Sequence, residues 1–406
     1  MRDFRLLWAG ETISLLGSNV AAVALPLVAV VTLQAGTFVV GLLSAIAWLP
    51  WFLVGLPAGA WVDRWRKRPV MMACNVISMV VFVSIPVAAW LGVLSVAQLL
   101  VVALLGGVTK VFFTTAYRAY VPLIVHDGQL LGANARLQGS ESAVQVAGPG
   151  LGGVLAQAFG AVAGLLVDAV SFGVSALSLR FIKTEEDRPK RSERRLRAEI
   201  ADGVRFLAHD PYLRRLAVFA AISNVALEGY QAIQIVFLSR DLGLSPGMVG
   251  LALAVSALGG VAGAGIAGWV SARIGTARAF LIAEAVAALL LLIGPFGLVT
   301  FVIAGVAISM GLLVSNILTV TFRQRYCPPE LFGRITTSIA TLSYGGIALG
   351  ALLGGALGQW LGVRPTMWVM APLQLVAVLV VCPLWKERDF PSRSAARPPH
   401  RLQPQR

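Results

Sequence analysis

Apolar runs long enough to cross a lipid bilayer recur along nearly the whole chain, and they constrain its fold more than any other feature. A helix needs about 20 apolar residues to span the hydrocarbon core. Inside lipid, only helices and closed barrels satisfy every backbone N–H and C=O group. We therefore predict an all-α integral membrane protein with twelve spans, at approximately 6–33, 38–61, 70–91, 96–117, 137–160, 162–182, 214–238, 246–270, 278–296, 299–321, 335–360 and 365–385.

The amino-acid composition excludes an ordinary soluble domain. Hydrophobic residues make up 57% of the chain and charged residues 13%, which is far from the balance of a soluble globular protein. The 42 glycines suit close packing between helices in lipid. Three cysteines, Cys74, Cys327 and Cys382, have neither the spacing of a disulfide framework nor that of a metal site.

Positive charges are concentrated in every second loop. The basic stretches are the N-terminal segment, 64–68, 118–136, 183–215, 273–278, 323–334 and the C-terminal tail. The loops between them carry only Arg240 and Arg364. Because basic loops remain in the cytoplasm, we expect a multi-pass protein of the inner (cytoplasmic) membrane with both termini cytoplasmic. Topology thus accounts for the net charge of +14, and we expect no nucleic-acid partner.

The chain contains an internal repeat. Residues 59–64 align with 268–273 at an offset of 209 residues, and residues 152–160 align with 354–362 at an offset of 202. A duplicated membrane protein is the simplest interpretation. We predict an N-terminal six-helix half at 1–182, a cytoplasmic linker at 183–213, a C-terminal six-helix half at 214–385 and a disordered basic tail at 386–406. Within the linker, residues 192–207 have the composition of an amphipathic surface helix.

Residues 59–68 read Gly-Ala-Trp-Val-Asp-Arg-Trp-Arg-Lys-Arg. This stretch resembles the loop signature Gly-x-x-x-Asp-Arg-x-Gly-Arg-Arg of the major facilitator superfamily, with Arg66 in place of the second glycine. The chain resembles most the drug-export branch that includes macrolide efflux proteins and the enterobactin exporter. That placement rests on Trp8, Gly10, Ala116, Arg118, Pro122, Leu131, Ala133 and Asn134. The resemblance implies two pseudo-symmetric six-helix halves and transport by alternating access.

The signature also implies a gate. Gly59, Asp63 and Arg64 match it, and the Asp63 carboxylate is expected to meet the positive N-terminus of a neighbouring helix when the cytoplasmic side is closed. In the second copy of the repeat Ala272 stands at the position of Asp63. The structural alternative is an ordinary charged turn that only sets topology. We predict a gating latch in the first half alone.

A second motif lies in the fifth span. Residues 148–153, Gly-Pro-Gly-Leu-Gly-Gly, are similar to the antiporter motif Gly-Pro-x-x-Gly-Gly of the exporting branches, although Val144 stands where an earlier glycine is usual. The matching residues are Gly148, Pro149, Gly152 and Gly153. The equivalent stretch 350–355 has no proline, so we expect a kinked helix in the first half only. The motif favours export over uptake.

Glu228 is the first candidate for coupling, because an ionisable group deep in a span is costly and usually functional. The repeat aligns it with Asn19, and we expect the two side chains to face each other across a central cavity, with Asn224 one turn from Glu228. Protonation of Glu228 would remove its desolvation penalty and permit a conformational change. The alternative is a structural hydrogen bond between helices.

A second set of charged residues lies in the first half. Lys110 is expected to pair with Glu141 or Asp168 and to form a charge network there. Asp168 is equally compatible with a role in helix packing. Glu11 is a weaker candidate because it is close to cytoplasmic water, and Glu284 is expected to lie outside the cavity.

Together these features predict a secondary active exporter, driven by proton antiport, of a hydrophobic or amphipathic small molecule such as a drug, an antibiotic or a siderophore-like metabolite. The alternatives are a nutrient importer of the same fold and a non-transporting membrane sensor. A Walker loop, a catalytic triad and metal-ligand spacing are all missing from the sequence, so we expect no enzyme, cofactor or metal site. The expected partners are the substrate, protons and membrane lipid, and we expect a monomer.

Overall fold

The computed structural model describes residues 2–125, 129–184, 186 and 205–391. In this part of the chain the regular structure is helical and contains no strand. The long helices are α1 (Arg2–Leu27), α2 (Thr37–Arg64), α3 (Lys67–Trp90), α4 (Val96–Ile124), α5 (Leu130–Phe159), α6 (Ala161–Arg180), α8 (Pro211–Val236), α9 (Pro246–Ile274), α10 (Thr276–Leu291), α11 (Leu298–Tyr326), α12 (Pro329–Trp360) and α13 (Val363–Val381). The predicted all-α membrane fold is confirmed.

Among the described residues, 11 helices are long and apolar enough to cross a membrane. The remaining long helix, α5, is less apolar because its sequence is rich in glycine and contains several glutamines. Several helices extend beyond their predicted spans. For example, α4 continues to Ile124 and α12 begins at Pro329, because polar and basic residues can prolong a helix past the hydrocarbon core.

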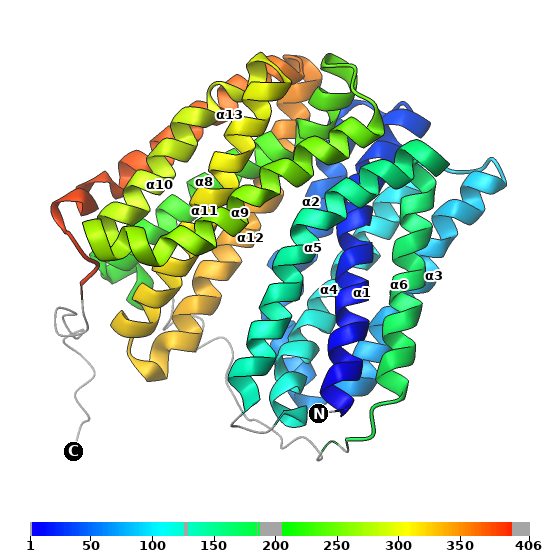
Figure 1. Ribbon diagram of the computed structural model, residues 1–406, viewed down its shortest axis with the longest axis horizontal. Coiled ribbons are helices and arrows are strands. Elements are labelled where there is room, and N and C mark those ends of the chain that lie inside the picture. Colours follow the sequence, from blue (N-terminus) through cyan, green and yellow to red (C-terminus); the bar gives the residue numbers. More distant parts are fainter. Residues whose placement is uncertain (1, 126–128, 185, 187–204, 392–406) are drawn as a thin grey trace.

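The helices form two bundles (Figure 1). In the first, α1 packs on α5 and α6, α2 packs on α4, and α3 packs on α4 and α6. In the second, α8 packs on α12 and α13, α9 on α11, and α10 on α11 and α13. The bundles meet chiefly where α2 contacts α12 and where α5 contacts α9.

The structure repeats local features at the offset found in the sequence. The π-helical segment Val28–Thr32 follows α1, and a second π-helical segment, Phe237–Asp241, follows α8. Their first residues are 209 positions apart. A π-helical turn is uncommon, so its presence at both places supports the duplication that the sequence predicts.

The bundles touch closely at one end only. A Cβ added to Gly41 would fall on backbone atoms of Gly355, and one added to Gly153 would fall on backbone atoms of Gly250. Toward the other end, a Cβ on Gly59 would have no heavy atom within 4 Å. Figure 1 shows the bundles diverging toward the end where α1 begins. We call this the open end, and the opposite one the closed end.

Hydrophobic packing follows the same division. One cluster of buried side chains, which includes Leu27, Leu43, Ile233 and Val249, draws on helices of both bundles at the closed end. Two further clusters each belong to one bundle at the open end. The first-bundle cluster contains Phe4, Met71, Tyr120 and Leu179, and the second-bundle cluster contains Phe219, Phe280, Tyr326 and Val381. The shared core is therefore at the closed end.

The chain that leaves α6 is held against the first bundle. The Asp3 carboxylate accepts hydrogen bonds from the backbone N–H of Lys183 at 3.1 Å and of Thr184 at 2.9 Å. The Glu186 carboxylate accepts from the N–H groups of Lys67 and Arg68 at the start of α3. Most of the predicted linker (183–213), most of its predicted amphipathic helix (192–207) and the tail beyond residue 391 lie outside the described residues. The domain limits stay a prediction.

We predict that Gly259→Leu destabilises the second bundle, because the new Cβ would fall on the backbone carbonyl of Val306 in α11. Overpacking of this kind typically costs about 1–3 kcal/mol, and we expect a lower melting temperature in detergent. Gly265→Leu is the matched control, since a Cβ on Gly265 of the same helix α9 has no atom within 4 Å. Equal melting temperatures for the two variants would contradict the packing.

Candidate functional site

The glycines of the motif in α5 are contact points for two other helices. A Cβ on Gly148 would fall on Asn19 of α1, and one on Gly152 would be 3.0 Å from the Val20 carbonyl oxygen. Gly153 faces Gly250 of α9, in the other bundle. The motif therefore lets α5 approach α1 within its own bundle and α9 across the closed end. Helix α5 is continuous through its proline, and the predicted kink stays a prediction.

The structure brings four charged side chains of the first bundle into electrostatic interaction. The Lys110 ammonium of α4 interacts with the carboxylates of Asp168 in α6, Glu11 in α1 and Glu141 in α5. Lys110 and Glu141 are exposed, whereas one carboxylate oxygen of Glu11 is fully buried without a hydrogen-bond partner. Glu11, the weaker candidate in the sequence, therefore acts on the same Lys110 ammonium as the predicted partners Glu141 and Asp168.

Asp168 is buried where α6 crosses α1. Its carboxylate accepts hydrogen bonds from Ser18 Oγ at 3.3 Å and from Ser171 Oγ at 3.4 Å. The helices approach closely because residue 17 is glycine: a Cβ there would fall on Ser171 and on the Asp168 backbone. Asp168 therefore serves packing through its hydrogen bonds and also acts on Lys110 through its charge.

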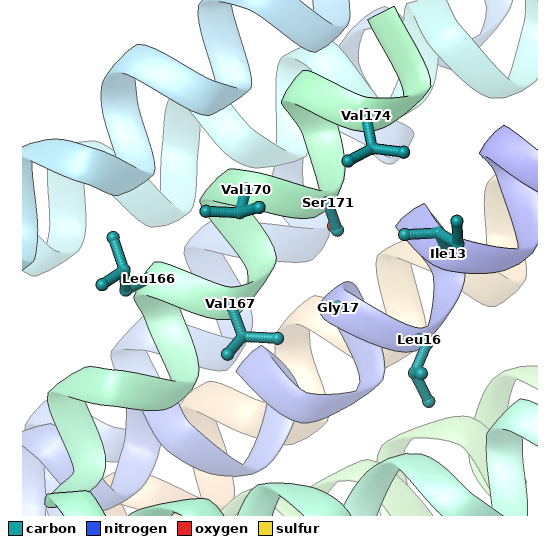
Figure 2. A pocket seen from close by; sticks show the side chains of 8 residues that line it. All are labelled: Ile13, Leu16, Gly17, Leu166, Val167, Val170, Ser171 and Val174. Carbon is teal, nitrogen blue, oxygen red and sulfur yellow. The ribbon is translucent and has the colours of Figure 1, made fainter. Parts of the chain in front are cut away.

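An apolar pocket of about 330 Å³ lies at this crossing (Figure 2). Its walls are mainly aliphatic side chains of α1 and α6, among them Ile13, Leu16 and Val170. Ser171 lines it as well, but the Ser171 hydroxyl donates to the Asp168 backbone carbonyl at 2.7 Å. None of the charged candidates is among its lining residues.

Glu228 stands apart from that network. It is half-buried in α8, and none of the hydrogen bonds among the described residues involves its carboxylate. Its neighbour Gly229 packs against Gly354 of α12, and Asn224 packs beside Gly346 of the same helix. The Asn19 amide donates within its own helix, to the Leu15 carbonyl at 2.9 Å. The predicted facing of Asn19 and Glu228 stays a prediction.

The gating residues lie at the open end, where α2 ends at Arg64. Asp63 and Arg64 are exposed, and the Asp63 carboxylate takes part in none of the hydrogen bonds among the described residues. Gly59 has open space where its side chain would be. With the bundles apart at this end, the predicted latch is not engaged in this structure.

One neighbouring cation has a role that the sequence did not reveal. Arg68 donates from Nε to the Leu179 carbonyl at 2.8 Å and from Nη2 to the Arg180 carbonyl at 2.7 Å. Since these carbonyls lie at the C-terminus of α6, Arg68 ties α3 to α6. The only sequence signal was the basic residue itself, which topology already explained.

Glu284 is buried away from the other candidates. It accepts a hydrogen bond from Ser315 of α11 and another from the Gln374 amide of α13, the latter at 3.0 Å. Asn75, at the equivalent position of the repeat, donates to Ser175 of α6 at 2.9 Å. Both residues therefore join helices within their own bundle.

Aromatic rings gather along α2. Trp48 and Trp51 pack against Tyr344 of α12, with ring centroids 5.9 and 4.9 Å apart. Nearer the open end, Trp61 stacks on Phe112 of α4 at 6.0 Å. The first group joins the two bundles, and the second lies within the first bundle.

Two helical bundles that meet at one end are the major facilitator fold, which solved structures of membrane transporters share. A family model described as a transmembrane secretion effector matches residues 1–403. The chain belongs to this family, which confirms the resemblance found in the sequence.

Relatives of known activity cover most of the chain. The chain is 26% identical to a multidrug efflux pump, Tap, of Mycolicibacterium fortuitum, over 85% of this chain and 87% of the relative. It is 25% identical to the enterobactin exporter EntS of Citrobacter koseri, over 87% and 85%. It is 20% identical to macrolide efflux protein A of Streptococcus pyogenes, over 95% and 96%.

Solved structures show the same fold. A bacterial homologue of the iron transporter ferroportin in its inward-facing state matches with a TM-score of 0.77 at 17% identity, over 95% of this chain and 98% of the other. Its outward-facing state matches with a TM-score of 0.62 at 17% identity, over 96% and 99%.

Proposed function

We propose that the protein is a proton-coupled exporter of hydrophobic or amphipathic small molecules. The observation that carries the proposal is the set of ionisable groups in the membrane-spanning helices: the Lys110 network and the isolated Glu228. Groups of this kind at membrane depth are expensive and typical of coupling or substrate pathways. Relatives named as efflux pumps and exporters support the outward direction.

The placement of basic residues supports one orientation of the protein in the membrane. The basic stretches that include Arg68 and Arg273 lie at the open end, together with the start of α1. At the closed end, the two arginines of the loops have protein partners: Arg240 donates to the Ala35 carbonyl at 2.8 Å, and Arg364 lies over the Phe237 ring. The positive-inside rule therefore supports a cytoplasmic open end, from which the transporter would take up its substrate.

Glu228 and the Lys110 network would have different tasks. Among the described residues, no charged group acts on Glu228, so taking up a proton would remove the cost of holding a carboxylate at that depth and would favour a different arrangement of α8 and α12. In the first bundle, Lys110 offsets the charge of the surrounding carboxylates. The network would therefore provide polar contacts for an amphipathic substrate.

We expect the protein to lower the accumulation of at least one compound in an efflux-deficient bacterial host. The measurement compares wild type with an empty vector over a panel of antibiotics, dyes and siderophore-like compounds. A protonophore should abolish the difference, because the proton gradient supplies the driving force. Raised accumulation would favour an importer, and no difference for any compound would favour a sensor or one dedicated substrate.

Replacing Glu228 by glutamine should lower the rate of uphill transport about tenfold or more, because the amide cannot exchange a proton. Substrate binding should be retained. Transport against a gradient in proteoliposomes and equilibrium binding to the purified protein measure the two effects. Glu284→Gln is the control, since Glu284 is a second intramembrane carboxylate that is hydrogen-bonded inside its bundle. Unchanged uphill transport in Glu228→Gln would move the coupling role to Glu11, Glu141 or Asp168.

Asp63→Asn should slow turnover severalfold at normal expression. The substituted side chain loses the charge that would stabilise a helix N-terminus when the cytoplasmic end closes. Initial export rates, normalised to protein in the membrane, provide the measurement. Arg66→Gln is the control, because Arg66 is exposed at the same end and stands where the family signature has glycine. Turnover of Asp63→Asn equal to wild type would exclude the latch.

A further inference from the structure

At the closed end, a glutamine of the first bundle caps a helix of the second. Gln157, near the end of α5, accepts hydrogen bonds at Oε1 from Ser245 Oγ at 3.2 Å and from the Gly247 N–H at 3.0 Å. Ser245 and Gly247 form the start of α9. The first N–H groups of a helix have no partner within the helix, so Gln157 satisfies one of them across the boundary between the bundles.

A second glutamine makes the reciprocal contact. Gln359, near the end of α12, accepts at Oε1 from the Phe38 N–H at 3.4 Å, in the first turn of α2. The same oxygen would be only 2.7 Å from a Cβ added to Gly36. Gln157 and Gln359 are equivalent positions of the repeat, and so are Phe38 and Gly247. Each bundle thus caps one helix of the other.

Arg240 adds a third contact between the bundles. From the second bundle, its Nη2 donates to the Val30 carbonyl at 3.1 Å and to the Ala35 carbonyl at 2.8 Å, both in the first. Val30 belongs to the π-helical segment after α1. Carbonyls at the end of a helix lack intrahelical donors, and a guanidinium donates to them with a charge-assisted hydrogen bond.

These contacts share one property: they exist only while the closed end is shut. When the bundles separate there, the capped N–H and C=O groups lose their protein partners and must be hydrated. Neutral glutamine can form and break such a bond without leaving a buried charge behind, whereas a carboxylate would leave one. The caps therefore contribute a modest free energy in favour of the closed arrangement, and a transport cycle can overcome it.

We propose that Gln157, Gln359 and Arg240 are positioning residues that set the balance between the two transport states by closing the non-cytoplasmic end from opposite sides. They do not touch the charged candidates of the two bundles, so they would act on the conformational equilibrium and not on substrate or proton binding. The proposal rests on the proposed alternating-access transport.

The test measures the distance across the closed end without any substrate. Spin labels go on Leu91→Cys in the first bundle and Phe296→Cys in the second, both exposed at this end, with the native cysteines replaced by alanine. In Gln157→Ala/Gln359→Ala, we expect the ratio of separated to closed molecules to rise at least about fivefold, because three cross-bundle hydrogen bonds are lost. A distance distribution equal to that of the unsubstituted labelled protein would overturn the proposal.

Gln98→Ala is the matched control. Gln98 also lies at the closed end, but its Nε2 donates to the Ser84 carbonyl at 2.9 Å, within the first bundle. Its loss should leave the distance distribution unchanged. An equal shift in Gln98→Ala would mean that loss of any glutamine loosens this end, and would also overturn the proposal.

A second experiment does not depend on a destabilised variant. In Gln157→Cys/Gly247→Cys, the two Cβ atoms are expected about 3.8 Å apart, the distance from Gln157 Cβ to a Cβ built on Gly247, which suits a disulfide. Oxidation should cross-link the bundles and remove the separated population, and reductant should restore it. Failure to cross-link would refute the contact. Since both readouts are conformational, they stay valid if the exporter assignment fails.

Discussion

Close backbone contact at the closed end holds the two bundles together, and it requires glycine on both sides of each crossing. Helix α2 meets α12 at Gly41 and Gly355, and α5 meets α9 at Gly153 and Gly250. Within lipid, helices associate through packing and not through the hydrophobic effect, so the absence of a Cβ sets how near two helices can come. The shared hydrophobic cluster and the contacts between bundles both depend on this approach.

The two halves share a scaffold but not its charges. The π-helical ends of α1 and α8 recur at equivalent positions, as do the glutamine caps. By contrast, the Lys110 network belongs to the first bundle, whereas Glu284 in the second replaces the neutral Asn75 of the first. Packing and backbone satisfaction act equally on both copies, so they preserve the duplicated scaffold. A charged side chain in the membrane is costly wherever it is placed, so packing alone does not preserve it in both copies. The charged side chains therefore mark positions where the two copies diverged.

Much of the candidate site followed from residue type, and the remainder needed neighbours. Lys110, Glu141 and Asp168 stand out in the sequence because ionisable residues are rare in apolar spans. The interaction of Glu11 with Lys110, by contrast, depends on how α1 and α4 are placed in the fold. The role of Arg68 also depended on where α6 ends. Sequence shows that a polar group is present, but its partner lies on another helix at a distance along the chain that no local pattern encodes.

The sequence by itself determined the number and class of the helices, the alternation of basic loops, the duplication and the family. Each of these depends on local hydropathy, on charge or on a short motif, and these act along the chain. Only the tertiary structure decided which end of the molecule is closed and that Gln157 and Gln359 cap helices of the opposite bundle. Those properties belong to the relative placement of two bundles. That placement differs between the states of a transporter, although the sequence is the same in all of them.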